Sequence, residues 1–535
     1  MRGTGIRLGL SHLFLIGLFP VLALWAANIQ YVRVGDVWRS AAAVILLAAA
    51  LFLVSRVVAR NWDKAALSTS AALIVFFSYG HLYTELKGLR IGEWLVGRHR
   101  ILAPAVIGLL LVVFVAILRD GRWSRGMNRV MMVVGVALVL PPLAGVIAYQ
   151  IRAADASSAV PAGEELRLAA PAGNPSQSPD IYYIIVDGYG RADVLRELYG
   201  FDNAAFLTFL EERGFYVAGA SRSNYGQTLL SLASSLNLEY IQDLPGAPTG
   251  ASDDRLFLDE RIRNSLARRS LAAIGYRFVA FETTFDETSI DDADVYYIAY
   301  REYGPLVALN AFESQVVGTS FLRFYLDLQV QASRAWSDAA IEPGYEGHRN
   351  RILYTLATLG EVAELEGDNF VFVHVLAPHA PFVFGPQGER LQHTEPFTLK
   401  DTGTYFGSAE EYSWLYRDQL SYLNQLLMTA IDEILQKSDT TPIIILQGDH
   451  GPGAYLDWNT MDERSVYERF SMLNAYLFPE DSQDLLYPGI TPVNSFRALF
   501  AGHFGAETPL LEDRVYFSEG GSLYRFVDAT DVGVP

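Results

Sequence analysis

The stretch "IIILQGDHGPG", residues 443–453, is the part of the sequence that decides the fold. Its run of three isoleucines and a leucine predicts a short buried strand, and polar residues begin where that run stops. Asp449 and His450 therefore stand side by side at the end of a strand, directly before a turn that contains glycine and proline. The question is what else the chain brings to the same point.

Three further stretches predict strands of the same kind. Helical patterns such as "YRDQLSYLNQLLMTAIDEIL" (416–435) lie between the strands, so the sequence predicts an α/β domain with a mostly parallel sheet and helices on both faces. In such sheets, ligands bind beyond the carboxyl ends of the strands. Asp187 and His379 follow two of these strands, and we expect them to converge with the Asp-His pair. The stretches are "IYYIIVDGYG" (181–190), "YRFVAFE" (276–282) and "NFVFVHVLAPH" (369–379).

The first 150 residues carry nearly all of the long apolar runs. Five segments each approach the roughly 20 residues that a helix needs to cross a bilayer. We therefore predict a membrane domain with five transmembrane helices at 1–150, a linker rich in alanine, proline and serine at 151–179, and a catalytic domain at 180–535. The five segments are Leu8–Ala27, Ala41–Val58, Ala66–Tyr83, Ile101–Leu118 and Val130–Tyr149.

The basic residues of the loops orient this bundle. Nine lie on the side of the amino terminus and six on the opposite side, which favours a cytoplasmic amino terminus. An odd number of spans then places residues 180–535 on the extracytoplasmic (periplasmic) side of the inner (cytoplasmic) membrane. The loop "TELKGLRIGEWLVGRHR" (84–100) mixes apolar and basic residues, which suggests an amphipathic helix lying in the membrane interface.

The composition excludes several classes of function. The chain has no cysteine, so it can form neither disulfides nor thiolate metal sites. Its formal net charge of -19 argues against nucleic acid as a partner, because phosphate backbones demand a basic surface.

The residues at the strand ends point to metal chemistry. Two carboxylates and an imidazole, from Asp187, Asp449 and His450, are ligands that suit a divalent ion such as zinc or manganese. The best candidate for a reacting group is Thr228, in "SNYGQTLLSLASSLNLEY" (223–240), which follows a turn and opens an apolar helix. A helix start favours phosphate or sulfate, and a metal beside this hydroxyl would make it a nucleophile. Thr228 is also a residue type that often serves only as a helix N-cap.

With these motifs in place, residues 180 to about 510 resemble the alkaline phosphatase and sulfatase superfamily. Together with the five preceding spans, the whole chain resembles its lipoteichoic acid synthase and phosphoethanolamine transferase branch. The resemblance implies that Asp187, Asp449 and His450 are metal ligands and that Thr228 is both a ligand and the nucleophile. It also implies that His379, in "LAPHAPF" (376–382), contacts the transferred group or a second metal.

The sequence departs from the superfamily's patterns in three places. It lacks the Cys/Ser-x-Pro-x-Arg signature of sulfatases, and Asp187 stands alone where sulfatases often have an acidic pair, which favours phosphoryl transfer through threonine. Some membrane synthases have glutamate where Asp187 stands. After the Asp-His-Gly triplet, "PGA" (452–454) replaces the usual acidic continuation and no histidine follows soon, which predicts a single principal metal site.

The predicted function is therefore that of a metal-dependent transferase of the phosphoglycerol or phosphoethanolamine type. It would move a phospho-linked head group from a membrane phospholipid donor to a hydroxyl of a glycan, lipid or polymer acceptor, through an intermediate on Thr228. Two alternatives stay open: a sulfuric ester or phosphoester hydrolase of the same fold, and a catalytically silent membrane sensor or scaffold.

Several polar residues allow more than one interpretation. His379 is either a contact to the substrate or a loop histidine with a structural hydrogen bond. His374, inside a predicted strand, fits a core histidine better than a metal ligand. Arg464 and Arg469, in "MDERSVYERF" (461–470), either neutralise a phosphate or belong to a solvated helical face, and His503 is unassigned.

Overall fold

We describe the chain from a computed structural model. The described residues are 10–29, 32, 34–91, 94–119, 123–158, 165–169, 178–250, 252–283, 285–299, 311–325, 327, 343–393, 397, 407–519 and 522–533. The chain forms two compact units, one made of residues 1–154 and 303–340 and the other of residues 155–302 and 341–535.

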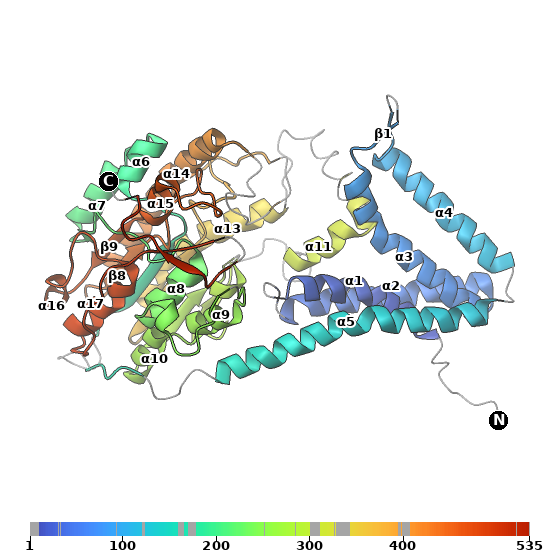
Figure 1. Cartoon of the computed structure of the whole chain (residues 1–535), viewed down its shortest axis with the longest axis horizontal. Coiled ribbons are helices and arrows are strands. Elements are labelled where there is room, and N and C mark those ends of the chain that lie inside the picture. Colours follow the sequence, from blue (N-terminus) through green and yellow to red (C-terminus); the bar gives the residue numbers. More distant parts are fainter. Residues whose placement is uncertain are drawn as a thin grey trace. The chain divides into compact units, whose positions relative to one another are not determined.

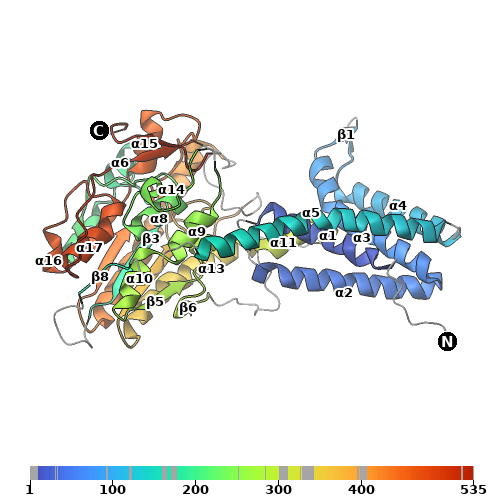
Figure 2. The same cartoon turned by 60° about the horizontal axis from the view of Figure 1, so that its bottom comes forward.

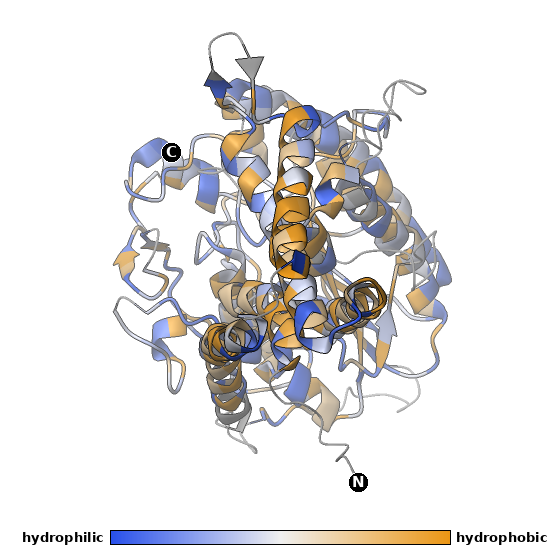
Figure 3. Ribbon diagram, turned by 90° about the vertical axis from the view of Figure 1, so that its right-hand side faces the viewer, coloured by the Kyte–Doolittle hydropathy of each residue, from blue (hydrophilic) through white to orange (hydrophobic). Residues whose placement is uncertain are grey.

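The first unit is built from helices at the positions of the five predicted spans (Figure 1). Among the described residues, four helices are long and apolar enough to cross a membrane, whereas α1, with 16 residues, is shorter than that. Much of the ribbon of these helices has the colour of hydrophobic residues in Figure 3. Many apolar side chains on α2, α4 and α5 are exposed, as expected for surfaces that face lipid. The helices are α1 (His12–Ala27), α2 (Val34–Ala59), α3 (Trp62–Leu86), α4 (His99–Arg119) and α5 (Ser124–Ser158).

The loop between α3 and α4 does not contain the expected interfacial helix. Its described part forms two short strands, β1 (Arg90–Ile91) and β2 (Trp94–Leu95), which pair antiparallel. The glycines at 88, 92 and 97 disfavour a helix, because glycine loses more conformational freedom than other residues when a helix forms. The prediction of an amphipathic helix here was wrong.

A segment far along the chain packs against the membrane helices. Helix α11 (Ala311–Thr319) belongs to the same unit as α1, α2 and α3. Glu313 on α11 forms an ion pair with Arg39 on α2, with 3.0 Å between Oε1 and Nε. Just after α11, the backbone N–H of Phe321 donates to the carbonyl of Phe76 on α3 at 2.7 Å. The segment between β6 and α13 thus returns to the membrane helices, which the sequence patterns did not indicate.

The second unit contains a seven-stranded sheet with the order β4-β9-β8-β3-β7-β5-β6. Strand β3 pairs parallel with both β7 and β8, and β5 and β6 continue the parallel part, whereas β9 pairs antiparallel with β8 and β4. The prediction of a mostly parallel sheet is confirmed. The strands are β3 (Ile181–Val186), β4 (Tyr216–Val217), β5 (Arg277–Phe281), β6 (Val295–Tyr297), β7 (Asn369–Val375), β8 (Ile443–Gln447) and β9 (Asn474–Leu477).

Helices cover both faces of this sheet (Figures 1 and 2). Alternate residues of β3 point to opposite faces, so Tyr183 joins the core beneath α8, α9, α10 and α17, while Tyr182 joins the core beneath α6, α7, α13 and α14. Every residue of β3, β7 and β8 is buried, which explains why these strands are continuous apolar runs in the sequence.

The remaining elements complete this unit. A second, two-stranded antiparallel sheet is formed by β10 and β11. These elements and the helices around the large sheet are α6 (Ala192–Tyr199), α7 (Ala204–Glu212), α8 (Thr228–Asn237), α9 (Leu256–Arg263), α10 (Leu266–Ala273), α13 (Pro343–Thr358), α14 (Ala409–Lys437), α15 (Glu463–Phe470), α16 (Glu480–Gln483), α17 (Ser495–Gly502), β10 (Tyr516–Ser518) and β11 (Phe526–Asp528).

Candidate metal centre

The loops after β3 and β8 are joined directly. Asp187 is the first residue after β3, and its backbone N–H donates to the carbonyl of Val375 on β7 at 2.9 Å. Gly188 has a φ of 73°, a left-handed conformation that favours glycine, and its N–H donates to Oδ1 of Asp449 at 3.1 Å. The turn after β3 therefore holds the carboxylate that follows β8.

One nitrogen lies at the centre of the site. The Nε2 atom of His450 is 3.2 Å from Oδ2 of Asp449 and 3.7 Å from Oδ1 of Asp187. It is also 3.3 Å from Oγ1 of Thr228. The three ligand candidates are all buried, and their ligand atoms lie within 4.8 Å of one another. The structure thus brings together the four residues that the sequence proposed for the metal site.

Thr228 stands at the start of α8, as predicted, but does not cap it. The N-cap position belongs to Gln227, and Thr228 is the first residue inside the helix. The interpretation of Thr228 as a simple N-cap is therefore wrong, and its hydroxyl is directed toward His450 instead. Behind it, the Ser231 hydroxyl donates to the carbonyl of Asp449 at 2.7 Å, which fixes the helix against the Asp-His loop.

His379 lies beside the other residues. Its backbone N–H donates to the carbonyl of Asp187 at 3.0 Å, and its ring centroid is 6.3 Å from that of His450. Its Nδ1 atom makes a short contact with the carbonyl of Ala380, and since a carbonyl can only accept, Nδ1 carries the proton. This contact fixes the orientation of the ring beside Asp187 and His450.

Histidines surround the Asp187 carboxylate. His374, on β7, has its Nε2 atom 3.3 Å from Oδ2 of Asp187 and its Nδ1 atom 2.8 Å from Oγ1 of Thr288. Burial alone would raise the pKa of Asp187, but His379, His374 and His450 together hold that pKa well below its usual range. Asp187 is therefore a carboxylate at neutral pH, as a metal ligand has to be.

The donor set fits a divalent cation. Oδ1 of Asp187 and Oδ2 of Asp449 are buried and accept no hydrogen bond from any part of the chain that the structure describes. A buried carboxylate oxygen without a partner costs free energy, and an ion between the two carboxylates would remove that cost. Burial lowers the pKa of His450, with a further contribution from Arg469, which keeps the imidazole neutral as metal binding requires.

The structure separates two arginines that the sequence left equivalent. Arg469 is buried, and its Nη2 atom is 2.9 Å from Nε2 of His450. Arg464, on the same helix, is exposed, and its guanidinium lies 3.3 Å from the ring centroid of Tyr455. Of the two arginines, only Arg469 lies at the site, and their positions in the sequence did not indicate which of them would. His503 is paired elsewhere, with Asp481 at 3.4 Å.

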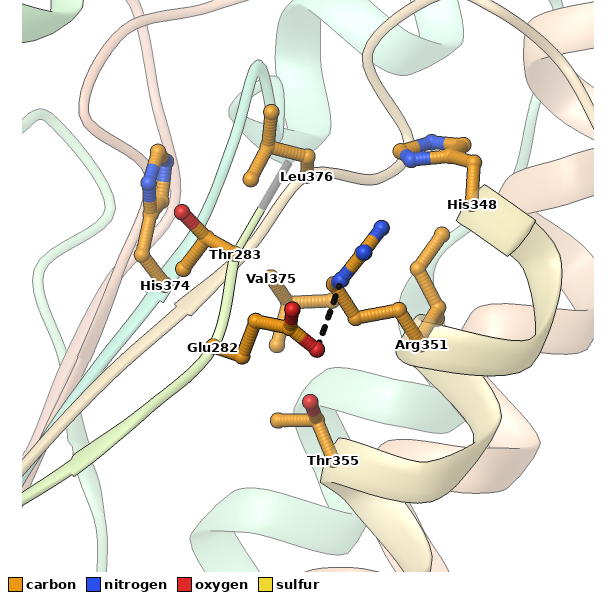
Figure 4. Close-up of a pocket in the computed structure, with 9 residues that line it drawn as sticks. Glu282, Thr283, His348, Arg351, Thr355, His374, Val375 and Leu376 are labelled. Atoms are coloured by element: carbon orange, nitrogen blue, oxygen red, sulfur yellow. Dashed lines mark ion pairs between the residues drawn. The ribbon is translucent and has the colours of Figure 1, made fainter. Parts of the chain in front are cut away.

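A small pocket adjoins the site through His374 (Figure 4). Its charged lining residues, Glu282 and Arg351, form an ion pair at 3.5 Å, drawn as a dashed line in the figure. Burial, helped by the charge of Arg351, lowers the pKa of His348 to about 3, so this histidine is neutral. Because the ion pair compensates its own charges, the pocket adds little net charge beside Asp187.

Comparison with known proteins gives likenesses of structure alone. The sequence matches no protein-family model and no curated protein. The zinc-bound C-terminal periplasmic domain of EptC from Escherichia coli matches with a TM-score of 0.43 and 11% identity, over 69% of this chain and 100% of that one. The integral membrane lipooligosaccharide phosphoethanolamine transferase A from Neisseria meningitidis matches with a TM-score of 0.35 and 12% identity, over 93% of this chain and 96% of that one.

A third match is a protein of the alkaline phosphatase superfamily from Vibrio parahaemolyticus. It has a TM-score of 0.37 and 10% identity, over 68% of this chain and 80% of that one. The structural matches thus include the superfamily and the transferase branch that the sequence motifs resemble. The assignment of the metal centre depends on the distances between its own residues and not on these matches.

Proposed function

We propose that the chain is a metal-dependent transferase that moves a phospho-linked head group from a membrane phospholipid to a hydroxyl of a glycan, lipid or polymer. The observation that supports this most is the position of the Thr228 hydroxyl. It lies 3.3 Å from Nε2 of His450, beside two buried carboxylates and at the start of a helix. A hydroxyl that served only to cap the helix would have no need of such a setting.

In the first step, Oγ1 of Thr228, in its ionised form after its proton has passed to water, attacks the phosphorus of the lipid head group. A bond forms between Oγ1 and phosphorus, and the bond between phosphorus and the diacylglycerol oxygen breaks. His379, with both ring nitrogens protonated at this stage, donates the proton on Nε2 to that leaving oxygen, so the products are a phosphothreonine-type intermediate and diacylglycerol. The first-turn N–H groups of α8, with the positive end of its dipole, stabilise the negative charge of the phosphoryl oxygens.

A divalent ion held by Asp187, Asp449 and His450 would favour the ionised form of Thr228 and offset the charge that develops on the phosphoryl oxygens. These three side chains would hold such an ion, while His379 lies in the loop after β7. Zinc and manganese both suit these ligands.

In the second step, the acceptor hydroxyl attacks the same phosphorus and loses its proton to His379. The bond between phosphorus and Oγ1 breaks, and Thr228 is restored in its ionised form. We place this reaction at the extracytoplasmic side of the inner membrane, because the amino-terminal helices hold the chain where donor lipids are concentrated.

The nucleophile can be tested in the full-length protein. Thr228→Ala should abolish turnover of the lipid donor while the protein stays folded and still binds metal, and Thr228→Ser should keep a fraction of the activity. Mass spectrometry of protein trapped with donor lipid should find the added group on Thr228. An adduct on another residue, or full activity of Thr228→Ala, would show that the nucleophile is misassigned.

The turnover measurement also separates a transferase from a hydrolase, when the destination of the head group is determined. A transferase leaves the head group on an added acceptor alcohol, whereas a hydrolase of the same fold releases it to water. Purified protein that binds neither zinc nor manganese would instead support a catalytically silent sensor or scaffold.

A further inference from the structure

Arg469 is anchored between the two loops that carry the nucleophile and the metal ligands. It lies on α15 and is 3% exposed. Its Nε atom donates to the carbonyl of Gly226 at 2.8 Å, two residues before Thr228. Its Nη1 atom lies 3.4 Å from the carbonyl of Gly451, directly after His450. These backbone contacts fix the guanidinium without any help from a metal ion.

The third contact of Arg469 uses an atom that a metal would also need. The Nδ1 atom of His450 lies 2.9 Å from the carbonyl of Gly451, so Nδ1 donates and carries the proton of the neutral ring. The lone pair is therefore on Nε2, and Nη2 of Arg469 donates to it at 2.9 Å. A single lone pair cannot serve both an arginine N–H and a metal ion.

We propose that Nη2 of Arg469 gives up its hydrogen bond to His450 when the metal binds. It then donates a hydrogen bond to an oxygen of the anionic phosphoryl group that is attached to Thr228 or attacked by it. This inference rests on the proposed function and extends it. The exchange needs no movement of the helix, because Nε keeps its bond to Gly226. The phosphoryl group lies within reach, because Oγ1 of Thr228 is 3.3 Å from the His450 nitrogen that Nη2 contacts.

The charges of the site support this role. A divalent ion with the two carboxylates of Asp187 and Asp449 and a neutral His450 has no net charge. Arg469 adds a single positive charge, which matches the single negative charge of the phosphodiester that forms on Thr228. A guanidinium also presents several N–H donors in a planar fork that suits phosphate oxygens. Arg469 is then the residue that makes the site selective for an anion.

The neighbouring carboxyl is engaged in a different task. Glu468 accepts hydrogen bonds from the backbone N–H groups of Ala454 and Tyr455, each at 2.9 Å. It thereby holds the loop after the Asp-His-Gly triplet, the place where the sequence lacks the usual acidic continuation. Glu468 thus anchors that loop, and the next residue of α15, Arg469, supplies the positive charge of the guanidinium.

The test compares zinc and phosphate binding in full-length protein carrying Thr228→Ala, so that no covalent adduct occupies the site. The variants are Arg469→Gln, Arg469→Lys and, as a matched control on the same helix, Arg464→Gln. Calorimetry measures the affinity for zinc alone and then for inorganic phosphate with zinc present. Circular dichroism and the melting temperature check that each variant is folded.

Arg469→Gln should weaken the binding of phosphate to the zinc-loaded protein by about tenfold or more, since one charge-assisted contact is lost. The same change should raise the affinity for zinc, because a competitor for the His450 lone pair is removed, and a purely structural arginine would not have this effect. Arg469→Lys should weaken phosphate binding less. Arg464→Gln should change neither affinity.

An unchanged phosphate affinity in Arg469→Gln would overturn the proposal, and so would equal effects of the Arg464 and Arg469 variants. If Arg469→Gln does not fold, Arg469→Lys decides, because a lysine that binds phosphate as well as arginine does would exclude a specific role of the guanidinium. A protein with native Arg469 that binds no zinc, or that binds zinc but no phosphate, would instead refute the proposed function itself.

Discussion

Asp449 shows how one carboxylate can serve both the fold and a metal. Its Oδ1 atom accepts from the backbone N–H of Gly188 at 3.1 Å and from that of His450 at 3.0 Å. Its Oδ2 atom receives no hydrogen bond from the described residues and faces Nε2 of His450 at 3.2 Å. The first oxygen orients the carboxylate, and the second is left for a cation.

We expect Asp449→Asn to weaken metal binding far more than His374→Gln does. Asparagine keeps an oxygen and the shape of the side chain but removes the negative charge beside the ion, whereas His374 acts on the site through its contact with the Asp187 carboxylate. Loss of such an indirect contact typically costs about 10- to 100-fold in metal affinity, and loss of a charged ligand should cost more. Zinc titration of the two purified variants measures the difference. Equal affinities would mean that the ligands are wrongly assigned.

Glu468 gives the second unit a dependence of stability on pH. Burial raises the pKa of Glu468 from 4.5 to about 7, although hydrogen bonds from Tyr199 and two backbone N–H groups oppose the shift. Between these two values, the folded protein holds a proton on Glu468 that the unfolded chain releases. Its contribution to stability is therefore fully present below about pH 4.5 and is lost as the pH rises through about 7.

Glu468→Gln should remove this dependence, because glutamine cannot ionise. The free energy of unfolding of the wild type should fall more than that of the variant between about pH 5 and about pH 8, by up to about 3 kcal/mol. Urea unfolding of both proteins in detergent at the two pH values provides the measurement. Parallel pH profiles would show that Glu468 keeps its ordinary pKa in the folded protein.

At the scale of elements, α11 depends on a glycine in α3. A Cβ atom added at Gly80 would lie 2.4 Å from the carbonyl oxygen of Gly318 and 2.5 Å from that of Thr319. Real Cβ atoms do not approach backbone atoms so closely, and backbone cannot yield as the end of a flexible side chain can. Gly80 is therefore what allows the segment to lie against the membrane helix.

Gly80→Ala should force α11 away from α3 and expose the segment around Thr319 to proteases. Gly108→Ala, in α4, is the matched control, because a Cβ there meets nothing within 4 Å. We expect a lower melting temperature and faster proteolysis for the first variant and wild-type behaviour for the second. If both variants behave alike, α11 does not pack on α3 as described.

For the whole molecule, the bound metal should stabilise the second unit more than the first. Removal of the ion leaves the carboxylates of Asp187 and Asp449 buried with unpaired oxygens. A ligand at 100 times its dissociation constant stabilises a fold by about 2.7 kcal/mol. A chelator should therefore lower the unfolding temperature of this unit, and Asp449→Asn should be insensitive to the chelator. An equal response of both proteins would indicate that the chelator acts elsewhere.

The predicted orientation can be tested with single cysteines, since the chain has none of its own. Glu212, exposed on the second unit, is expected outside the cytoplasm, and Arg125, exposed in the first turn of α5, is expected inside. A maleimide that cannot cross membranes should label Glu212→Cys in intact cells and Arg125→Cys only after lysis. The reverse pattern would invert the topology. The predicted boundaries at residues 150 and 179 also stay predictions.

The sequence by itself determined the class of the fold and most of the candidate site. Parallel strands that are buried on both faces have to be continuous apolar runs, so β3, β7 and β8 are recognisable from their residues alone. Because the carboxyl ends of parallel strands meet at one edge of a sheet, residues at those ends converge, and this brought Asp187 and Asp449 together. The length and hydropathy of the amino-terminal segments likewise predicted the membrane helices.

Which of two arginines on one helix joins the site depends on how distant segments of the chain pack. Arg464 and Arg469 share one helix and one chemistry, and the path of the loop after His450 makes one buried and leaves the other exposed. The return of α11 to α3 depends in the same way on contacts that no local pattern encodes. Periodicity reports how a residue faces its own helix or strand, whereas a contact between distant segments depends on how the whole chain packs.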